Sequence, residues 1–227
     1  YGTKEMLEIF GEQKKVDYQL QIEAAAALSQ SEINLIPKSI AKDIARAARS
    51  GKITAKRIKQ LETKSDHDTA ALVESLAERC KKESRPWIHY GLTSNDLVDT
   101  SNSMQMRDAI KIIQPKVGKL ALLLSKNAVK YKVLPAVGRT HGQHASIISF
   151  GLKFANWASE MATHLERLDE IKKRILICKT LGVVGTGSLM GKDAVRVQEL
   201  VAKKLSLFPA KVTTQIIPRE RYAEYIF

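Results

Sequence analysis

The feature that most constrains the fold is a helical periodicity sustained over residues 146–178. Apolar side chains recur there at mostly three- and four-residue steps, at Phe150, Phe154, Trp157, Met161, Leu165, Leu168, Ile171 and Ile175. A helix of about 30 residues is about 45 Å long, which is too long for a small globule. It must therefore pack lengthwise against neighbouring helices, and the periodicity predicts a helical bundle.

The rest of the chain also predicts helices. They are expected over residues 3–30, from Pro37 to Gly51, after a cap at Thr54, from Ser65 to Pro86, over 103–132 with a kink at Pro115, from Lys192 to Leu207, and from about Tyr222. The sequence therefore predicts an all-α fold. We expect an N-terminal helical domain over residues 1–105 and, over 106–227, the first part of a central long-helix bundle.

The charge of the chain indicates an anionic partner. The 227 residues carry 37 Lys and Arg against 24 Asp and Glu, a formal net charge of +13. The basic residues are spread over helix faces, as in "KKRILICK", and do not alternate with aromatic residues, so the pattern disfavours nucleic acid. A small, strongly anionic metabolite fits the charge equally well. A basic helical scaffold that binds RNA or DNA stays open as the alternative.

The chain has no run of apolar residues as long as a membrane span and no apolar signal-like segment at its start. Cys80 and Cys178 lie far apart and show no metal-like spacing. We therefore expect a cytoplasmic protein with two reduced thiols. The last residues, "RERYAEYIF", stop in the middle of an apolar pattern, so we expect the chain to be part of a longer protein.

Two polar segments in the first half of the chain are candidate sites. "KSDHDT" places His67 between Asp66 and Asp68, either as an ordinary helix N-terminus or as an imidazole tuned by carboxylates. "WIHYGLTSNDLVDTS" follows His89 with a cluster of small donors and acceptors that includes Thr93 and Ser94. Such a cluster suits carboxylate or phosphate oxygens, or it caps the next helix.

Two further polar segments lie in the second half. "GRTHGQHA" contains His141 and His144, without a cysteine or a third ligand at fixed spacing, so a metal site is not expected there. A histidine in this setting suits general acid or base catalysis. "LGVVGTGSLMGKD" fits neither the P-loop nor the dinucleotide-binding pattern, since Met190 stands at the third glycine of the latter. It is interpreted as a flexible connection that approaches a ligand or another chain.

These segments together resemble the adenylosuccinate lyase family of the fumarase/aspartase superfamily. "HYGLTSNDLVDT" and "GRTHGQHA" are similar to its first two signature regions. "YGTKEM", the "HD" at 67–68, "GVVGTG" and "TTQIIPRERYAEY" match in the same order, so the resemblance covers the whole chain. Gly142 stands where argininosuccinate lyase and fumarase typically have leucine. Argininosuccinate lyase or another lyase of the superfamily is the alternative within this class, and a catalytically inactive homologue is a third possibility.

The resemblance implies an activity and an assembly. The reaction is the elimination of fumarate from adenylosuccinate, giving AMP, and from the succinylated aminoimidazole carboxamide ribotide, with no metal or organic cofactor. The implied assembly is a homotetramer whose active sites are built from three subunits. The family's third signature, a mobile serine-containing loop that supplies the base, does not occur before Phe227. The 227 residues alone are therefore expected to be inactive.

The resemblance also implies roles for individual residues. His141 would be the general acid that protonates the departing nitrogen, and His67 would assist it. His144 would have a positioning role only. Substrate binding would fall to Tyr1, Asp66, His67, Asp68, His89, Thr93, Ser94, Thr214 and Gln215. Of these, Thr93 and Ser94 would bind the carboxylates on the fumarate side, and Tyr1 would lie near the phosphate. Asp66 stands where the family commonly has a basic residue. The family usually has an arginine just before the Tyr-Gly pair, and the given sequence begins at Tyr1.

Overall fold

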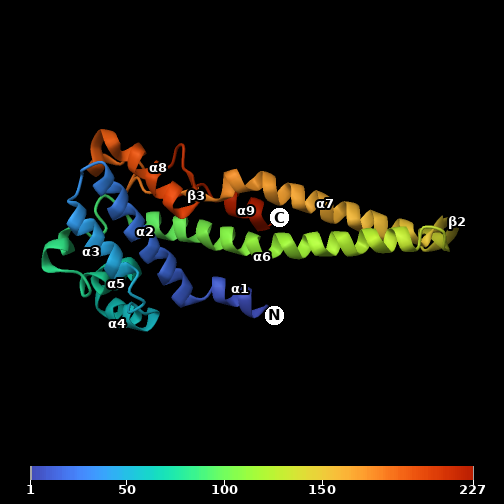
Figure 1. Cartoon of the computed structure of the whole chain (residues 1–227), viewed down its shortest axis with the longest axis horizontal. Coiled ribbons are helices and arrows are strands. Elements are labelled where there is room, and N and C mark those ends of the chain that lie inside the picture. The colour runs from blue at the N-terminus through green and yellow to red at the C-terminus, as the bar shows by residue number, and fades with distance from the viewer. Residues whose placement is uncertain (1, 227) are drawn as a thin grey trace. The chain divides into compact units, whose positions relative to one another are not determined.

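The computed structural model describes residues 2–226 and divides into two compact units. Unit 1 consists of Tyr1–Asp108 and Lys173–Phe227, and unit 2 of the intervening Ala109–Lys172. Figure 1 labels the α-helices of both units together with β2 and β3. The helices dominate, and the predicted all-α fold is confirmed. The domain boundary at residue 105 stays a prediction.

Unit 1 is helical apart from one parallel pair of two-residue strands among its described residues. Its elements are α1 (Lys4–Ile9), α2 (Glu12–Glu32), α3 (Lys38–Ala48), α4 (Ala55–Ser65), α5 (Asp68–Ala77), a 3₁₀ helix (Lys82–Trp87), the first part of α6 (Ser94–Lys130), β3 (Ile177–Cys178), a second 3₁₀ helix (Ser188–Asp193), α8 (Ala194–Leu205), β4 (Phe208–Pro209) and α9 (Glu220–Ile226). The end of α7 also belongs to unit 1.

Helix α2 is the centre of unit 1 and packs against α3 and α8. Its middle carries the run "EAAAAL", and all four alanines of this run are buried. Alanine side chains are small, so neighbouring helices can approach the α2 backbone closely from more than one side. Branched residues such as Ile22 and Ile44 fill the space around this contact and are fully buried. Their burial removes apolar surface from water and stabilises the unit.

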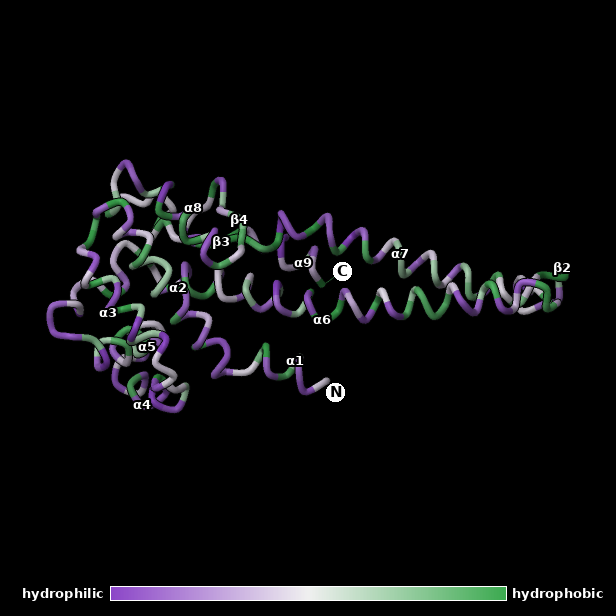
Figure 2. The backbone as a smooth tube through the Cα atoms, in the orientation of Figure 1, coloured by the Kyte–Doolittle hydropathy of each residue, from purple (hydrophilic) through white to green (hydrophobic). Residues whose placement is uncertain are grey.

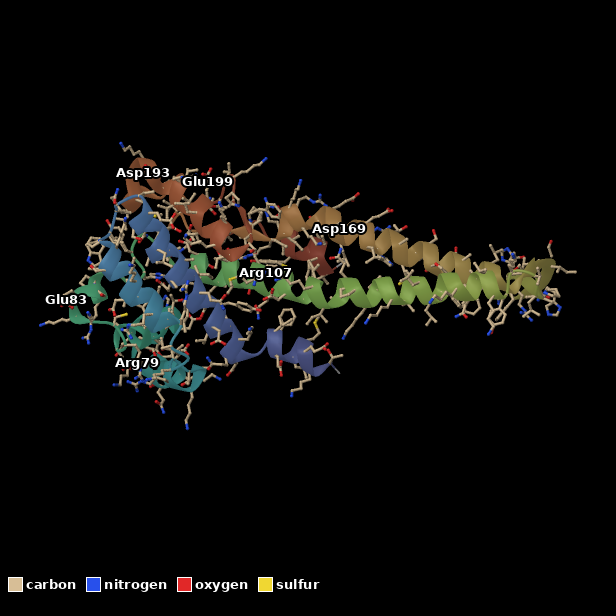
Figure 3. All side chains as sticks on the ribbon, in the orientation of Figure 1. Arg79, Glu83, Arg107, Asp169, Asp193 and Glu199 are labelled. Carbon is tan, nitrogen blue, oxygen red and sulfur yellow. The ribbon has the colours of Figure 1, made fainter. Side chains whose placement is uncertain are left out.

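The first part of α6 is tied to the end of α8. The Arg107 guanidinium, labelled in Figure 3, donates a hydrogen bond to the Leu205 carbonyl at the last residue of α8. The last carbonyls of a helix have no partner within the helix, and basic side chains commonly satisfy them. The Tyr18 hydroxyl of α2 donates to Asp108 at 2.7 Å. These bonds fix this part of α6 against α2 and α8.

Several helix ends in unit 1 differ from the prediction. The predicted helix over 3–30 is two helices, because the chain breaks at Phe10 and Gly11 between α1 and α2. Ser65 ends α4 and does not begin the next helix. His67 instead is the N-cap of α5, and its Nδ1 accepts a hydrogen bond from the Ala70 N–H at 3.3 Å. Of the two interpretations of "KSDHDT", the helix N-terminus is therefore confirmed.

Other boundaries agree better. Thr54 caps α4, as predicted, by accepting from the Arg57 N–H at 3.2 Å. Helix α5 ends at Ala77 rather than at Pro86, which lies inside the first 3₁₀ helix. The predicted helix over 103–132 is present but begins earlier, at Ser94, and α6 continues through Pro115.

Unit 2 contains the rest of α6, the strands β1 (Pro135–Thr140) and β2 (Gln143–Ser149), and most of α7 (Phe150–Ile175). The strands pair antiparallel, with Thr140 opposite Gln143. His141 and Gly142 thus form a two-residue turn, with φ of 51° and 74°. Positive φ at both central residues is characteristic of the type I′ turn that suits a twisted hairpin. The helix predicted over 146–178 begins only at Phe150, because residues 143–149 pair with β1.

The helices of unit 2 pack along their lengths. Tyr131 at the end of α6 lies 5.7 Å, between ring centroids, from Phe150 and 5.8 Å from Phe154 of α7. Towards the other end, Asp169, labelled in Figure 3, accepts from Gln114 of α6 at 2.7 Å. Lys172 donates to both of these side chains, at 2.6 and 2.9 Å. Lengthwise packing of the long helices is the arrangement that their periodicity predicts.

Gly151 permits the close approach of α7 to α6 at the hairpin end of unit 2. A Cβ at this position would overlap the Ala128 carbonyl and lie 2.9 Å from the Lys132 nitrogen. We expect Gly151→Ala to lower the free energy of unfolding by about 1–3 kcal/mol, the usual cost of overpacking. Gly118→Ala, in α6 where a Cβ meets nothing within 4 Å, is the matched control.

The control is expected to raise the free energy of unfolding by about 0.5–1 kcal/mol, because alanine is the better helix former. Denaturant unfolding followed by circular dichroism measures both variants. Equal effects of the two substitutions would contradict the close approach.

Candidate functional site

The polar segment that precedes α6 is organised by a carboxylate in the first turn of this helix. The Thr93 N–H donates to Asp96 Oδ2 at 2.9 Å, and the Asp96 N–H donates to the Thr93 carbonyl at 2.9 Å. This is the return half of a capping box, and the carboxylate also favours the positive end of the helix. Among the described residues, the hydroxyls of Thr93 and Ser94 have no hydrogen-bond partner. They remain available to a ligand.

Asp96 also holds the segment that follows β3. Its carboxylate forms an ion pair with Lys179, and both side chains are fully buried. The Gly182 N–H donates to Asp96 Oδ2 at 2.9 Å, while Lys179 Nζ donates to the Gly182 carbonyl at 3.2 Å. Burial raises the pKa of Asp96, and the charge and hydrogen bond of Lys179 act against that rise. The glycine-rich segment is thereby fixed to the start of α6.

The glycines of "GVVGTG" approach other parts of the same chain. A Cβ on Gly182 would lie 3.1 Å from the Gly91 carbonyl. Gly185 has φ of 77°, and a Cβ there would overlap the Thr213 carbonyl and lie 2.7 Å from that of Thr214. Within the described residues this connection approaches residues 91 and 213–214 of its own chain, and its approach to a ligand or another chain stays a prediction. Glycine is needed because a side chain would separate these backbones.

Asp99, one turn after Asp96, fixes the segment that contains Thr214 and Gln215. Its buried carboxylate accepts hydrogen bonds from the Ile217 N–H at 2.8 Å and from Arg219 at 2.6 Å. The Tyr222 hydroxyl donates to the same carboxylate at 3.0 Å. Burial, with the charge of Asp99 added, raises the pKa of Tyr222 to about 12. Thr214 and Gln215 themselves are exposed.

His89 is held by Glu23, a buried carboxylate of α2. Glu23 Oε1 lies 2.6 Å from His89 Nδ1, and Glu23 Oε2 accepts from the His89 N–H at 3.0 Å. Burial alone lowers the pKa of His89, but the hydrogen bond and charge of Glu23 and the charge of Asp96 outweigh it and raise this pKa above its ordinary value. His89 therefore keeps its proton to a higher pH than a histidine without such neighbours.

Two groups of predicted site residues lie apart from this hydrogen-bond network. His67 and Asp68 are about half exposed at the α4–α5 junction, with His67 Nδ1 3.8 Å from Asp68 Oδ1. Asp66 is the C-cap of α4, in a left-handed conformation. Among the described residues, no hydrogen bond or ion pair joins these three to residues 87–101. Tyr1 lies outside the described residues.

His141 and His144 belong to the hairpin of unit 2. His141 is exposed at the two-residue turn, and His144 Nε2 lies 3.3 Å from an Arg139 guanidinium nitrogen. The network of unit 1 thus collects the segments of His89, Thr93, Ser94, Thr214 and Gln215, whereas the predicted acid stands in unit 2.

The predicted site residues do not include four residues of the network: Glu23, Asp96, Asp99 and Lys179. Asp96 and Asp99 carry a signal in the sequence, because they lie one helical turn apart within the segment that was singled out.

The arrangement places hydroxyl groups without a described partner and an imidazole with a raised pKa in one network. Among residues 2–226, no group of three or more His, Cys, Asp or Glu side chains is placed to hold a metal ion. The helices described in the same residues are each too short or too polar to span a lipid bilayer. Cys80 and Cys178 are buried free thiols.

The chain is similar to known proteins along its whole length. A family model described as lyase matches residues 2–227. An adenylosuccinate lyase from Methanocaldococcus jannaschii is 42% identical over 227 residues, which are 100% of this chain and 49% of that protein. An adenylosuccinate lyase from Methanothermobacter thermautotrophicus is 38% identical over 226 residues and 50% of its length. The chain thus spans about half the length of the curated relatives it matches.

Solved structures show the same fold. A fumarate lyase from Mesorhizobium sp. BNC1 superposes with a TM-score of 0.92 at 30% identity, covering 100% of this chain and 54% of that one. A β-carboxy-cis,cis-muconate cycloisomerase from Acinetobacter calcoaceticus superposes with a TM-score of 0.91 at 30% identity, covering 98% of this chain and 53% of its own.

Removal of the Asp99 charge tests whether this carboxylate holds the segment of Thr214 and Gln215. We expect Asp99→Asn to lower the free energy of unfolding by about 1–3 kcal/mol, because the Ile217 N–H, the Arg219 guanidinium and the Tyr222 hydroxyl lose a charged acceptor. Hydrogen exchange at the Ile217 amide should accelerate more than exchange in α2. Glu220→Gln, at the exposed start of α9, is the control and should change stability by less than about 0.5 kcal/mol. Unchanged protection of Ile217 in Asp99→Asn would contradict the role of the carboxylate.

Proposed function

The chain belongs to the lyase family whose model it matches, and on this premise we propose that the complete protein is an adenylosuccinate lyase. It would eliminate fumarate from adenylosuccinate, giving AMP, and from the succinylated aminoimidazole carboxamide ribotide. The observation that carries the proposal is the 37–42% identity to archaeal adenylosuccinate lyases over the whole chain. The activity would reside in the cytoplasm and need no metal or organic cofactor.

The reaction breaks a carbon–nitrogen bond, and its difficult step is the departure of the nitrogen. An amine anion is a poor leaving group, so a general acid must protonate the nitrogen as the bond breaks. We assign this role to His141. Its place at a hairpin turn supports the assignment, since the exposed imidazole is presented by a backbone that the β1–β2 ladder holds. His67 would assist His141 in this step. His144, which lies beside Arg139, would have a positioning role only.

The substrate carries one phosphate and two carboxylates, and unit 1 offers groups that suit them. The hydroxyls of Thr93 and Ser94 stand at the start of α6, where the helix dipole also favours an anion. His89 supplies a positive charge, and Thr214 and Gln215 supply exposed polar groups. Asp66, Asp68 and Tyr1 are assigned to substrate binding as well, with Tyr1 near the phosphate.

The assembly we propose is a homotetramer with active sites shared between three subunits. His141 belongs to unit 2, whereas the anion-binding groups belong to unit 1. Figure 2 shows hydrophobic positions recurring along α6 and α7. Many large apolar side chains of unit 2 are exposed in the single chain, including Leu122, Leu123, Val133, Ile147, Leu152 and Trp157. Exposure of this extent marks an interaction surface, and a central bundle of long helices would cover it.

An assay of the complete protein tests the proposal. Adenylosuccinate should be converted to AMP and fumarate, followed by the absorbance change, while argininosuccinate should not react. His141→Ala should lower the rate of the chemical step by a hundredfold or more, the usual scale of general acid catalysis. His144→Ala, the matched histidine of the same hairpin, should lose less.

Equal turnover of argininosuccinate would overturn the substrate assignment. Larger losses from His144→Ala than from His141→Ala would reverse the roles of the two histidines. Tight, salt-sensitive binding of RNA without any lyase activity would instead support a nucleic-acid scaffold.

A further inference from the structure

We propose that Glu23 is a positioning residue that holds His89 as an imidazolium and directs its second ring N–H to an anionic oxygen of the substrate. The inference rests on the proposed function and deepens it, since it names the group that makes His89 an anion-binding residue. The anionic oxygen belongs to a carboxylate or a phosphate.

The geometry shows that Glu23 is dedicated to His89. One carboxylate oxygen is bonded to the ring and the other to the backbone of the same residue, at 2.6 and 3.0 Å. Among the described residues, Glu23 has no other hydrogen-bond partner. Its side chain is only 2% exposed. A buried carboxylate is costly unless it is paired and hydrogen-bonded, so retaining one here for His89 alone indicates a purpose beyond packing.

The backbone of His89 is held in an unfavourable conformation by the same carboxylate. His89 has φ of 60°, a left-handed conformation that is unfavourable for a residue with a side chain. Glu23 Oε2 accepts the N–H of this residue, which fixes the backbone at this position. Gly91, two residues later, also has positive φ and packs against Met190. The ring is thus held from both the side chain and the backbone, and conformations of this kind cluster at ligand sites.

The charges around the ring determine its protonation. Glu23 of α2 faces Nδ1, and Asp96 of α6 adds a second negative charge that Lys179 partly neutralises. An imidazolium carries a proton on each ring nitrogen. The proton on Nδ1 is donated to the Glu23 carboxylate, and the second proton is on Nε2. Among residues 2–226, Nε2 has no hydrogen-bond partner, and the side chain is 20% exposed. An imidazolium in this position offers its Nε2–H to an oxyanion.

Substitution of Glu23 by glutamine in the complete enzyme tests the role. Glu23→Gln keeps the shape but removes the charge, so burial should push the pKa of His89 below its ordinary value. The KM for adenylosuccinate should rise about tenfold near neutral pH with kcat within about threefold, the result expected when a binding charge is lost. KM rises at the pH where His89 loses its proton and with it the binding charge. In Glu23→Gln this rise should occur at a pH about one unit lower than in the wild type.

Two matched variants separate positioning from packing. Glu23→Asp keeps the charge and should retain the wild-type pH dependence with a smaller rise in KM. Glu32→Gln removes a carboxylate from the end of the same helix, where it pairs with Lys204 at 2.5 Å, and should leave KM unchanged. In a His89→Gln background, Glu23→Gln should add no further rise in KM.

A stability loss in Glu23→Gln without a change in KM or in its pH dependence would overturn the proposal. Failure of the wild-type enzyme to release fumarate would refute the proposed function instead. In that case, NMR titration of the histidines of the complete protein, with His89 assigned by the loss of its signal in His89→Gln, still decides the role of Glu23. Titration of His89 at the same pH in wild type and Glu23→Gln would overturn it.

Discussion

The structure of unit 1 depends on two carboxylates, Asp96 and Asp99, that are buried one turn apart at the start of α6. Neither could stay charged in this position without partners, because burying an unpaired carboxylate costs far more than one hydrogen bond returns. The partners come from segments about 80 and 120 residues later in the chain. The need to pair these two charges therefore brings three polar segments together, and those segments carry most of the candidate binding residues.

This arrangement separates what holds the site from what acts in it. Asp96, Asp99 and Lys179 are buried and saturated with partners, so they fix backbone positions. Beside this frame lie four polar residues. The hydroxyls of Thr93 and Ser94 have no hydrogen-bond partner among the described residues, and the side chains of Thr214 and Gln215 are exposed. His89 lies between the two classes, anchored on one ring nitrogen by Glu23. A rigid, buried frame with a few free donors is the arrangement that recognition of a small polyanion requires.

The sequence predicts the helices and the candidate segments well and their tertiary partners poorly. Periodicity located the long helices because their apolar stripes are local information. The hairpin was missed because its turn is His141–Gly142 rather than the usual Asn-Gly, and Ile147 and Ile148 extended the helical pattern of α7 backwards. In the sequence, nothing distinguishes Glu23 from the other polar residues of a helix that is rich in alanine. Its burial against His89, 66 residues away, is a tertiary contact that no local pattern contains.

Unit 1 contains the proposed anion-binding groups and unit 2 the proposed acid, and we propose that one active site takes them from different subunits. Mixing complete proteins that carry His67→Ala and His141→Ala tests this claim most directly. After subunit exchange has been verified, hybrid oligomers should regain lyase activity well above that of either variant, because some sites then contain both histidines. An absence of recovery in verified hybrids would contradict shared sites.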